Sequence, residues 1–200
     1  IAISKFNTAK ILIGNISMDL TMSRSEIYKN PGALPTIKPG LIVDDLGRRD
    51  FSVNALCVSL NEKDWGSLID PHGGYSDLQS GIIRVLDSKS FIEDATRIIR
   101  AIRYSVRLDF CIEPETETLM KQHLRYIDTI HGDRLSNELM KVFREIRVSS
   151  ILMLAHNTGV LQAIFPTLKV HPQLIRKFSF PIRKTTSCEC FARKKHPYFK

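Results

Sequence analysis

The segment FIEDATRIIRAIRYSVRLDF, residues 91 to 110, places its apolar and its charged residues at helical spacing. Ala95, Val106 and the isoleucines between them fall on one side of such a helix. The other side receives the charged residues Asp94, Arg97, Arg100, Arg103 and Arg107. This division predicts an amphipathic α-helix with a buried apolar side, so any fold of this chain must give the segment a core to pack against.

The row of arginines has two interpretations. In the first, it is a solvent-exposed face on which Asp94 and Arg97 form an ion pair at i, i+3 spacing. In the second, the row faces an anion, because like charges along one helix face repel one another unless negative charge lies on them. Glu93 and Asp94 fall in the first turn, where negative charge suits the helix dipole.

The residues before this segment show a mixed pattern. Residues 10–14 and 16–23 favour two strands around a turn at Gly14 and Asn15. Residues 24–45 contain three prolines, which exclude a continuous helix and predict a loop.

The stretch from residue 48 to residue 86 is expected to add one helix and two short strands. Residues 48–62 predict the helix, and its inward side chains are expected to be Phe51, Ala55 and Leu56. Residues 66–70 and 82–86 predict the strands, on either side of the turn-rich DPHGGYSD.

Everything after residue 91 has a helical pattern. Further helices are expected within 114–130, 132–146 and 149–165, with helix-end residues Asp133, Ser149 or Ser150, and Gly159. The chain is therefore expected to have an α+β fold in which a mixed part precedes an all-helical part, joined near residues 87–92. The predicted units are 1–90, 91–170 and a basic tail, 171–200.

Composition excludes several classes of protein. The net charge of +8 invites a nucleic-acid partner, but residues 176–200 alone contribute +7, so any anion site in the rest of the chain depends on local clustering. No apolar run approaches the length of a membrane span and no signal peptide is visible, so no membrane partner is expected. Four cysteines indicate a reducing compartment, the cytoplasm or a eukaryotic organelle. Cys188, Cys190 and His196 lack the paired spacing of a zinc site.

Several stretches in a fixed order resemble one family. RRDFSVNAL, LIDPHGGYSDLQSGIIR and FIEDATRIIRAIRYSVRLDF resemble motifs of the class II tRNA nucleotidyltransferases and bacterial poly(A) polymerases, which include the CCA-adding enzymes. MDLTMSRSEIYKNPGALPTIKPGLIVDDL and HGDRLSNELMKVF resemble further segments of that family, so the match runs from about residue 7 to about residue 168. The resemblance implies the C-terminal part of a polymerase β-like head with short strands, followed by a helical neck that binds RNA.

The resemblance also implies roles for individual residues. Asp94 and Arg97 would read the base of an incoming ATP or CTP, since a carboxylate and a guanidinium can mimic a Watson–Crick edge. Arg100 and Arg103 would orient that pair or bind phosphate, with Glu93 as a neighbour of the base. The residues expected against the ribose and triphosphate are Arg48, Arg49, Asp50 and Asn54. The residues expected to form turns are Asp70, Gly73, Gly74, Asp77 and Gly81.

The metal site implied by the resemblance is incomplete in this sequence. Family members hold Mg²⁺ with three carboxylates, two of them in a D-x-D pair after a Gly-Ser turn. Asp19 matches the third carboxylate, whereas the GS turn and the D-x-D pair are missing. The chain is therefore expected to be an N-terminally truncated piece of the enzyme and to be inactive alone.

Three interpretations of the chain as a whole stay open. The first is a piece of an enzyme that adds nucleotides to the 3′ end of tRNA without a template, with CCA, CC, A or poly(A) addition undistinguished. The second is a non-catalytic remnant that binds RNA or nucleotides, or one subunit of a split enzyme whose partner chain supplies the catalytic segment. The third is a helical scaffold with an incidental arginine face.

Overall fold

The computed structural model describes residues 2–3, 8–27 and 35–168. The tail from 171 and its Cys188, Cys190 and His196 lie outside the described residues. The first half of the chain consists of short strands and helices, with η marking a 3₁₀-helix: β1 (Ala2–Ile3), β2 (Thr8–Ile13), β3 (Ile16–Thr21), β4 (Arg24–Ile27), β5 (Thr36–Pro39), α1 (Ile42–Gly47), η1 (Ser52–Asn54), β6 (Cys57–Val58), η2 (Glu62–Asp64), β7 (Leu68–Ile69), α2 (Gly74–Ser80) and β8 (Ile82–Ile83).

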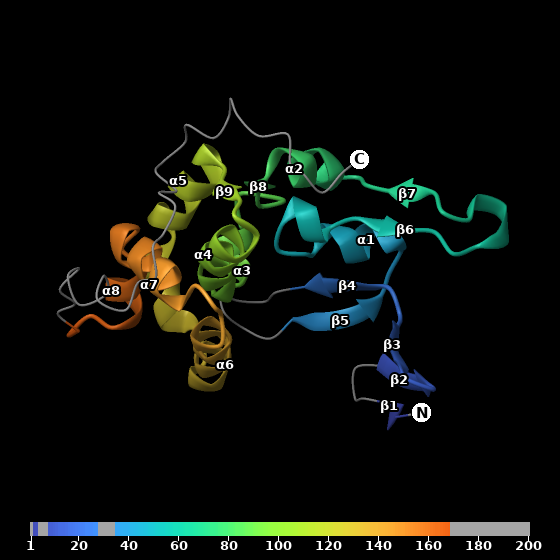
Figure 1. The fold of residues 1–200 in the computed structure, drawn as a ribbon, viewed down its shortest axis with the longest axis horizontal. Helices are drawn as coiled ribbons and strands as arrows, with labels where there is room; N and C mark the ends of the chain where they lie inside the picture. The colour runs from blue at the N-terminus through green and yellow to red at the C-terminus, as the bar shows by residue number, and fades with distance from the viewer. Residues whose placement is uncertain (1, 4–7, 28–34, 169–200) are drawn as a thin grey trace.

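The second half is almost entirely helical. Figure 1 shows these helices gathered on one side of the molecule, with strands β1 to β7 on the other. Within the described residues no helix is both long and apolar enough to span a bilayer. The elements are α3 (Ser90–Glu93), α4 (Thr96–Leu108), β9 (Cys111–Ile112), α5 (Pro114–Gln122), η3 (Leu124–Thr129), α6 (Gly132–Phe143), α7 (Val148–Asn157) and α8 (Val160–Ile164). The expected α+β class is confirmed.

The first hairpin is confirmed, and the loop predicted over residues 24–45 is wrong for 24–27, 36–39 and 42–45, whereas its residues 28–34 lie outside the described residues. β2 and β3 pair antiparallel around Gly14, whose φ of 58° is the conformation that glycine adopts at little cost. Within 24–45, β4 and β5 form a second antiparallel hairpin and α1 follows it. The prolines excluded a long helix but not a strand, because Pro39 ends β5, where its missing N–H costs little.

The helix predicted over residues 48–62 is also wrong. Phe51 has an extended backbone and bridges Val85, and the Ser52 amide donates to the Arg84 carbonyl at 2.9 Å. This pairing with a distant segment replaces the local helix, leaving only the short η1 and β6. The expected inward residues are confirmed for Phe51 and Ala55, which are completely buried, and Leu56 is half-buried.

The stretch from Asp70 to Gly81 forms a turn and then a helix. Asp70 accepts hydrogen bonds from the amides of Gly74 and Tyr75 at 2.7 and 2.9 Å, and so caps α2. Gly73 and Gly81 bound the helix with φ of 69° and 67°. The turn prediction therefore holds for residues 70–73 but not for 74–77, where α2 begins and Asp77 pairs with Arg84 at 2.9 Å.

Gly74 is required by a close approach of two backbones. A Cβ at this position would lie 2.0 Å from the Ser52 carbonyl oxygen, whereas a Cβ on Gly73 would meet no atom within 4 Å. We therefore expect Gly74→Ala to lower the free energy of unfolding by about 2 kcal/mol or more, because backbone has to move. Gly73→Ala is the control and should cost only about 1 kcal/mol, from its positive φ. Urea denaturation measures both, and equal losses would contradict the close approach.

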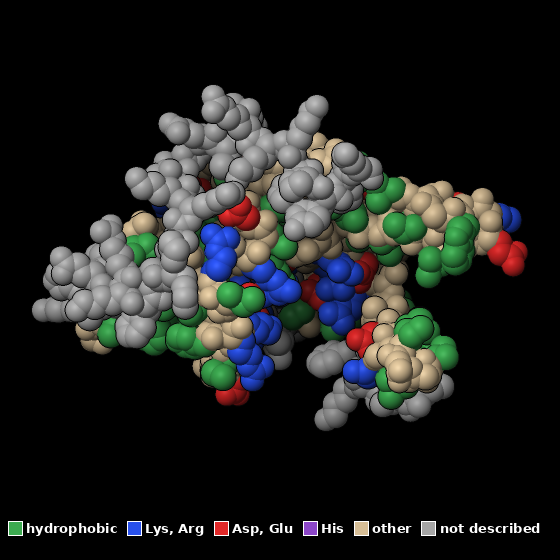
Figure 2. Space-filling view, in the orientation of Figure 1, with side chains coloured by type: hydrophobic (Ala, Val, Ile, Leu, Met, Phe, Trp, Pro, Cys, Tyr) green, Lys and Arg blue, Asp and Glu red, His purple; other side chains and the backbone are tan. Residues whose placement is uncertain are grey.

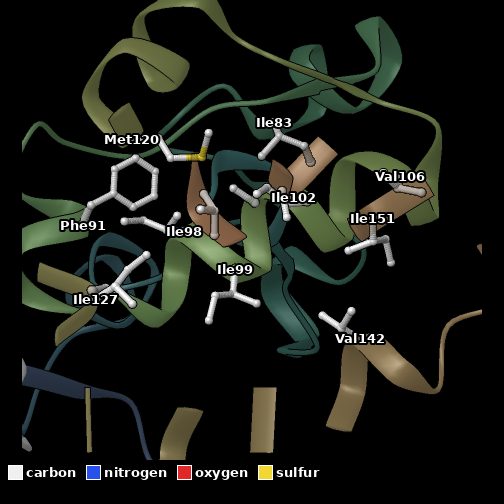
Figure 3. Close-up of a cluster of buried hydrophobic side chains, with 14 of the residues drawn as sticks. Ile83, Phe91, Ile98, Ile99, Ile102, Val106, Met120, Ile127, Val142 and Ile151 are labelled. Atoms are coloured by element: carbon white, nitrogen blue, oxygen red, sulfur yellow. The ribbon is translucent and has the colours of Figure 1, made fainter. Parts of the chain in front are cut away.

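One hydrophobic core joins both halves of the chain. Figure 3 shows Ile98, Ile99, Ile102 and Val106 of α4 surrounded by side chains of the other helices and by Ile83. Phe51 belongs to the same core, and β8 pairs in parallel with β9 beyond residue 91. The core thus crosses the join expected near 87–92, and it confirms that the apolar face of the 91–110 segment is buried.

The helix over 91–110 is interrupted, and two of the expected helix ends are wrong. At Asp94 the backbone turns extended (φ −142°, ψ 93°) between α3 and α4. His131 precedes α6 in place of Asp133, and Ser149 and Ser150 are buried inside the first turn of α7. Gly159, with a φ of 81°, does separate α7 from α8 as predicted.

Candidate functional site

A polar cavity of about 590 Å³ lies where β4, the turn after α1, α4 and α6 meet. Five arginines and three carboxylates line it, so positive charge is in excess. The lining residues are Glu26, Pro35, Arg48, Arg49, Asp50, Asn54, Asp94, Arg97, Arg100, Tyr104 and Arg134. Figure 2 shows Lys and Arg side chains gathered across the middle of the molecule around this region.

One wall of the cavity is fixed by α1. Arg48 donates to Asp45 Oδ1 at 2.6 Å and to Glu26 Oε1 at 2.9 Å, while Arg49 donates to Asp45 Oδ2 at 3.1 Å. Burial acts to raise the pKa of Asp45, but the hydrogen bonds from Arg48 and then Arg49 outweigh it and hold that pKa below its usual value. Asp45 therefore acts as a negatively charged carboxylate that fixes the orientation of the Arg48 and Arg49 guanidinium groups.

Asp50 ties this wall to α4. Its Oδ1 accepts from the Phe51 amide at 2.9 Å and from Asn54 Nδ2 at 3.0 Å, and its Oδ2 lies 2.6 Å from Arg100 Nη2. Burial acts to lower the pKa of Arg100, but the charge of Asp50 raises it overall. A charged pair thus holds the turn after α1 against the middle of α4.

Arg97 is a second link between the same parts. Its side chain is buried, and it donates from Nη2 to the Arg48 carbonyl at 2.7 Å and from Nη1 to Ser90 Oγ at 2.8 Å. The guanidinium therefore reaches from α4 to α3 and to the end of α1 while it lines the cavity.

The ion pair expected between Asp94 and Arg97 is replaced by other contacts. Asp94 Oδ1 accepts from Thr96 Oγ1 at 2.6 Å, and its Oδ2 lies 2.7 Å from Arg134 Nη2 of α6. The i, i+3 geometry exists only in a continuous helix, and the extended backbone at Asp94 breaks it. Asp94 and Arg97 still line one cavity, but each is held by its own partners.

The interpretation of the arginine row as a solvent-exposed face is wrong for Arg97 and Arg103, which are buried. Protein carboxylates supply much of the negative charge that the row needs. Asp50 pairs with Arg100, and Glu145 lies 3.1 Å from Arg103 and 3.6 Å from Arg107. The row is also divided, because only Arg97 and Arg100 line this cavity.

The other predicted residues lie outside the cavity lining. Glu93 ends α3 without reaching the cavity, and burial followed by the charge of Asp87 raises its pKa. Arg103 lines a different hollow. Asp19 lies on β3, which is exposed along its whole length, opposite Lys10 in the β2–β3 register.

The Mg²⁺ site implied by the motifs is not met by the residues that the structure describes. Among them, no group of three or more Asp, Glu, His or Cys side chains is placed to hold a metal ion. Magnesium takes oxygen ligands in octahedral geometry, and Asp19 alone supplies too few of them.

Four lining residues were not singled out from the sequence: Glu26, Pro35, Tyr104 and Arg134. Glu26 and Arg134 belong to the segments SRSEIY and HGDRLSNEL, which were part of the resemblance, so a signal existed for both. Tyr104 lies at helical spacing on the same side as Arg97 and Arg100, so the periodicity of the segment could have pointed to it. Its ring lies edge-on to Phe51, with centroids 6.0 Å apart, and beneath the guanidinium of Arg103 at 4.5 Å.

Comparison with known proteins gives consistent matches along the chain. Residues 2–84 match the family described as poly(A) polymerase head domain, and residues 109–171 match the one described as "Probable RNA and SrmB-binding site of polymerase A". An A-adding tRNA nucleotidyltransferase of Geobacter sulfurreducens is 41% identical over 176 residues, which are 86% of this chain and 20% of that protein. The chain spans about a fifth of the length of the first such relatives, 20% and 22%.

Solved structures agree with the sequence relatives. A CCA-adding enzyme in its apo form II has a TM-score of 0.83 and 41% identity, over 86% of this chain and 42% of that one. A tRNA nucleotidyltransferase complexed with a primer tRNA and an incoming ATP analogue has a TM-score of 0.77 and 36% identity, over 88% of this chain and 49% of that one. The expected fold, a polymerase-type head with short strands and a helical part after it, is confirmed.

Proposed function

The chain belongs to the family of tRNA nucleotidyltransferases and bacterial poly(A) polymerases, and on that premise we propose that its cavity binds the incoming ATP or CTP during template-independent nucleotide addition to the 3′ end of tRNA. The observation that supports this most is the concentration of five arginines in one cavity between the head and α4. Guanidinium groups bind phosphate oxygens in pairs, so a triphosphate matches the excess positive charge.

The triphosphate and ribose would lie against the wall formed by the turn after α1. Arg49 is 42% exposed and shares Asp45 with Arg48, so its guanidinium is positioned but has donors left for phosphate. Asp50, Asn54 and Arg100 form the floor beside it. Arg103 does not line the cavity, but its guanidinium covers the ring of Tyr104, which does, so Arg103 would affect the nucleotide by holding Tyr104 in place.

The base would be read at the opposite end, where α3 and α4 meet. Asp94 offers a carboxylate, and Arg97 has N–H groups beyond those that contact Ser90 and Arg48. Arg134 stands beside Asp94 at 2.7 Å and would fix the direction in which the carboxylate points. Glu93 precedes Asp94 in the sequence and does not line the cavity, so it would be a neighbour of the base site that does not contact the base.

The metal chemistry of the family is proposed to need more than these 200 residues. Asp19 would be one Mg²⁺ ligand of the complete enzyme, and the remaining carboxylates would come from a segment of the same protein or from a partner chain. The incomplete ligand set also favours a second candidate function, a non-catalytic subunit or remnant that binds nucleotide and RNA. In either case residues 1–90 are proposed to act as a partial head, 91–170 as the nucleotide-reading and RNA-binding neck, and 171–200 as a basic tail.

Arg49→Ala tests the phosphate end of the cavity. We expect the affinity for ATP to fall by about tenfold or more, because one charge-assisted contact is worth roughly 1.5 to 3 kcal/mol, whereas affinity for adenosine should not change. Calorimetry with the full chain measures both ligands. Arg125→Ala, an exposed arginine on η3, is the matched control. If ATP binds the Arg49 variant as it binds the parent, the triphosphate does not lie on this wall.

A further inference from the structure

Glu138 of α6 is a buried carboxylate that the proposed function does not use. Its side chain is only 8% exposed, and Lys141 Nζ contacts its Oε1 at 2.6 Å. Its Oε2 is buried and has no hydrogen-bond partner among the described residues. A carboxylate loses much solvation free energy on burial, and one contact with a half-exposed lysine offsets little of that loss, so the burial of Glu138 needs an explanation.

The packing of α6 shows that Glu138 faces α4. Arg134, one turn before Glu138, contacts Asp94 beside the start of α4 at 2.7 Å. Val142, one turn after Glu138, lies in the core around α4 (Figure 3). Residues four apart lie on the same side of a helix, so the side chain of Glu138 is directed towards α4 between these two contacts.

Contacts near the two ends of this helix pair fix the level of Glu138 along α4. Asp94 and Arg134 meet at one end, and Arg103 meets the loop after α6 at the other end. Both helices rise by about 1.5 Å per residue, and Glu138 is four residues beyond Arg134. Glu138 therefore lies level with the turn of α4 that ends at Arg100.

Arg100 has a buried donor to match the free oxygen of Glu138. Its Nη2 lies 2.6 Å from Asp50 Oδ2, which belongs to the one carboxylate within ion-pair distance of it in the described ranges. Its Nε is buried and has no hydrogen-bond partner there. Burial acts to lower the pKa of Arg100, and the charges of Asp50, Tyr104 and Glu138, in that order, raise it overall. The charge of Glu138 thus already acts on Arg100 from α6.

We propose that Glu138 is a positioning residue for the nucleotide cavity, and that its buried carboxylate holds the guanidinium of Arg100 from the α6 side while Asp50 holds it from the turn after α1. The identity of the ligand rests on the proposed function. Arg100 lines the cavity and Glu138 does not, so Glu138 acts through Arg100 and does not touch the nucleotide. A guanidinium held from two sides loses little side-chain freedom when it meets a phosphate, which favours binding.

This role gives α6 a contact at each end of the cavity. Arg134 holds Asp94, where the base is proposed to lie, and Glu138 holds Arg100, beside the proposed place of the triphosphate. The two α6 residues are one turn apart, so the packing of α6 on α4 sets the position of both ends together.

Glu138→Gln in the full chain removes the charge and keeps the size of the side chain. We expect the affinity for ATP, measured by calorimetry, to fall by about fivefold, because Arg100 is less firmly placed for phosphate, whereas the affinity for adenosine should not change. The matched control is Lys141→Met, which removes the lysine contact of Glu138 at an exposed position and should alter both affinities by less than about twofold. An equal loss of ATP affinity in Lys141→Met would show that Glu138 serves only the lysine pair, and would overturn the proposal.

A double-mutant cycle between Glu138→Gln and Arg100→Gln tests the link itself, without nucleotide. Urea denaturation measures the unfolding equilibrium constant of the parent, of each single variant and of the double variant. The effects should depart from additivity by about fivefold, and Glu138→Gln should cost less stability in the Arg100→Gln background, where the Glu138 charge has lost this partner. If Glu138→Gln does not fold, Glu138→Asp takes its place, because it draws the charge back by one methylene and should show the same sign. Additive effects, within about twofold, would overturn the link.

The two measurements distinguish this link from the proposed function. Non-additive effects in a parent chain that binds no ATP would support the link between Glu138 and Arg100 and overturn the proposed function instead. Equal losses of ATP and adenosine affinity in Glu138→Gln would place its effect at the base, and would overturn the assignment to Arg100.

Discussion

The 200-residue chain, incubated with Mg²⁺, labelled ATP or CTP and a tRNA lacking its 3′-terminal nucleotides, is expected to incorporate no label above background. The reason is the ligand count, since Asp19 is the only carboxylate of the sequence that matches the metal-site motif. It lies on an exposed strand, and among the residues that the structure describes no group of three or more acidic, His or Cys side chains is placed to hold a metal ion. A single carboxylate leaves Mg²⁺ with most of its waters, so the reacting groups are neither aligned nor neutralised.

Supplying the missing motif should reverse this result. With the family's GS…DxD segment fused before Ile1 or added as a separate chain, incorporation should rise above background, and Asp19→Ala should return it to background. Asp64→Ala, an exposed carboxylate in η2, is the matched control and should keep the restored activity. Extension of tRNA by the bare chain would show that the ligand count or the role of Asp19 is wrong. A fused protein that folds and stays inert would favour the non-catalytic binding protein.

Arg97→Ala is expected to have the largest effect of any single substitution in the cavity. It leaves the Arg48 carbonyl and Ser90 Oγ without their donor and removes a buried guanidinium, so the free energy of unfolding should fall by about 3 kcal/mol. The affinity for ATP or CTP should fall by about tenfold or more, because the base loses a charged donor. Chemical denaturation and calorimetry measure the two effects.

Two further variants of α4 separate the causes. Arg107 lies on the same helix, but its side chain is exposed and its ion pair with Glu145 is long, at 3.6 Å. Arg107→Ala should therefore change the free energy of unfolding by less than about 1 kcal/mol. Arg97→Lys keeps the charge but loses the forked geometry, so it should restore only part of the stability and of the affinity. Nucleotide affinity that survives Arg97→Ala in a folded protein would remove Arg97 from the base site.

The sequence predicted those features that depend on short-range periodicity or on ordered motifs. The apolar face of α4, the β2–β3 hairpin and the glycines at 73, 81 and 159 follow from local rules. The motifs also selected most of the cavity, because seven of the nine residues expected at the nucleotide line it: Arg48, Arg49, Asp50, Asn54, Asp94, Arg97 and Arg100.

The two failures over residues 24–45 and 48–62 share a physical cause, which is that a distant segment offered better contacts than the local pattern. Residues 48–62 do not form the predicted helix, because Phe51 and Ser52 pair with the segment around Arg84 and Val85. Residues 24–45 formed a hairpin because Arg24 and Ile27 found partners at Pro39 and Thr36. Such pairings connect residues far apart in the chain, and periodicity within a short window does not contain them.

The sequence by itself determined that α4 would present arginines on the side opposite its apolar face, since helical spacing alone requires this. Only the tertiary structure decided which partner each arginine meets. The extended backbone at Asp94 parts it from Arg97, Asp50 holds Arg100, and Glu145 comes from the loop after α6 to meet Arg103. Charge partners are chosen by proximity in space, because a buried guanidinium must find acceptors wherever the packed helices bring them.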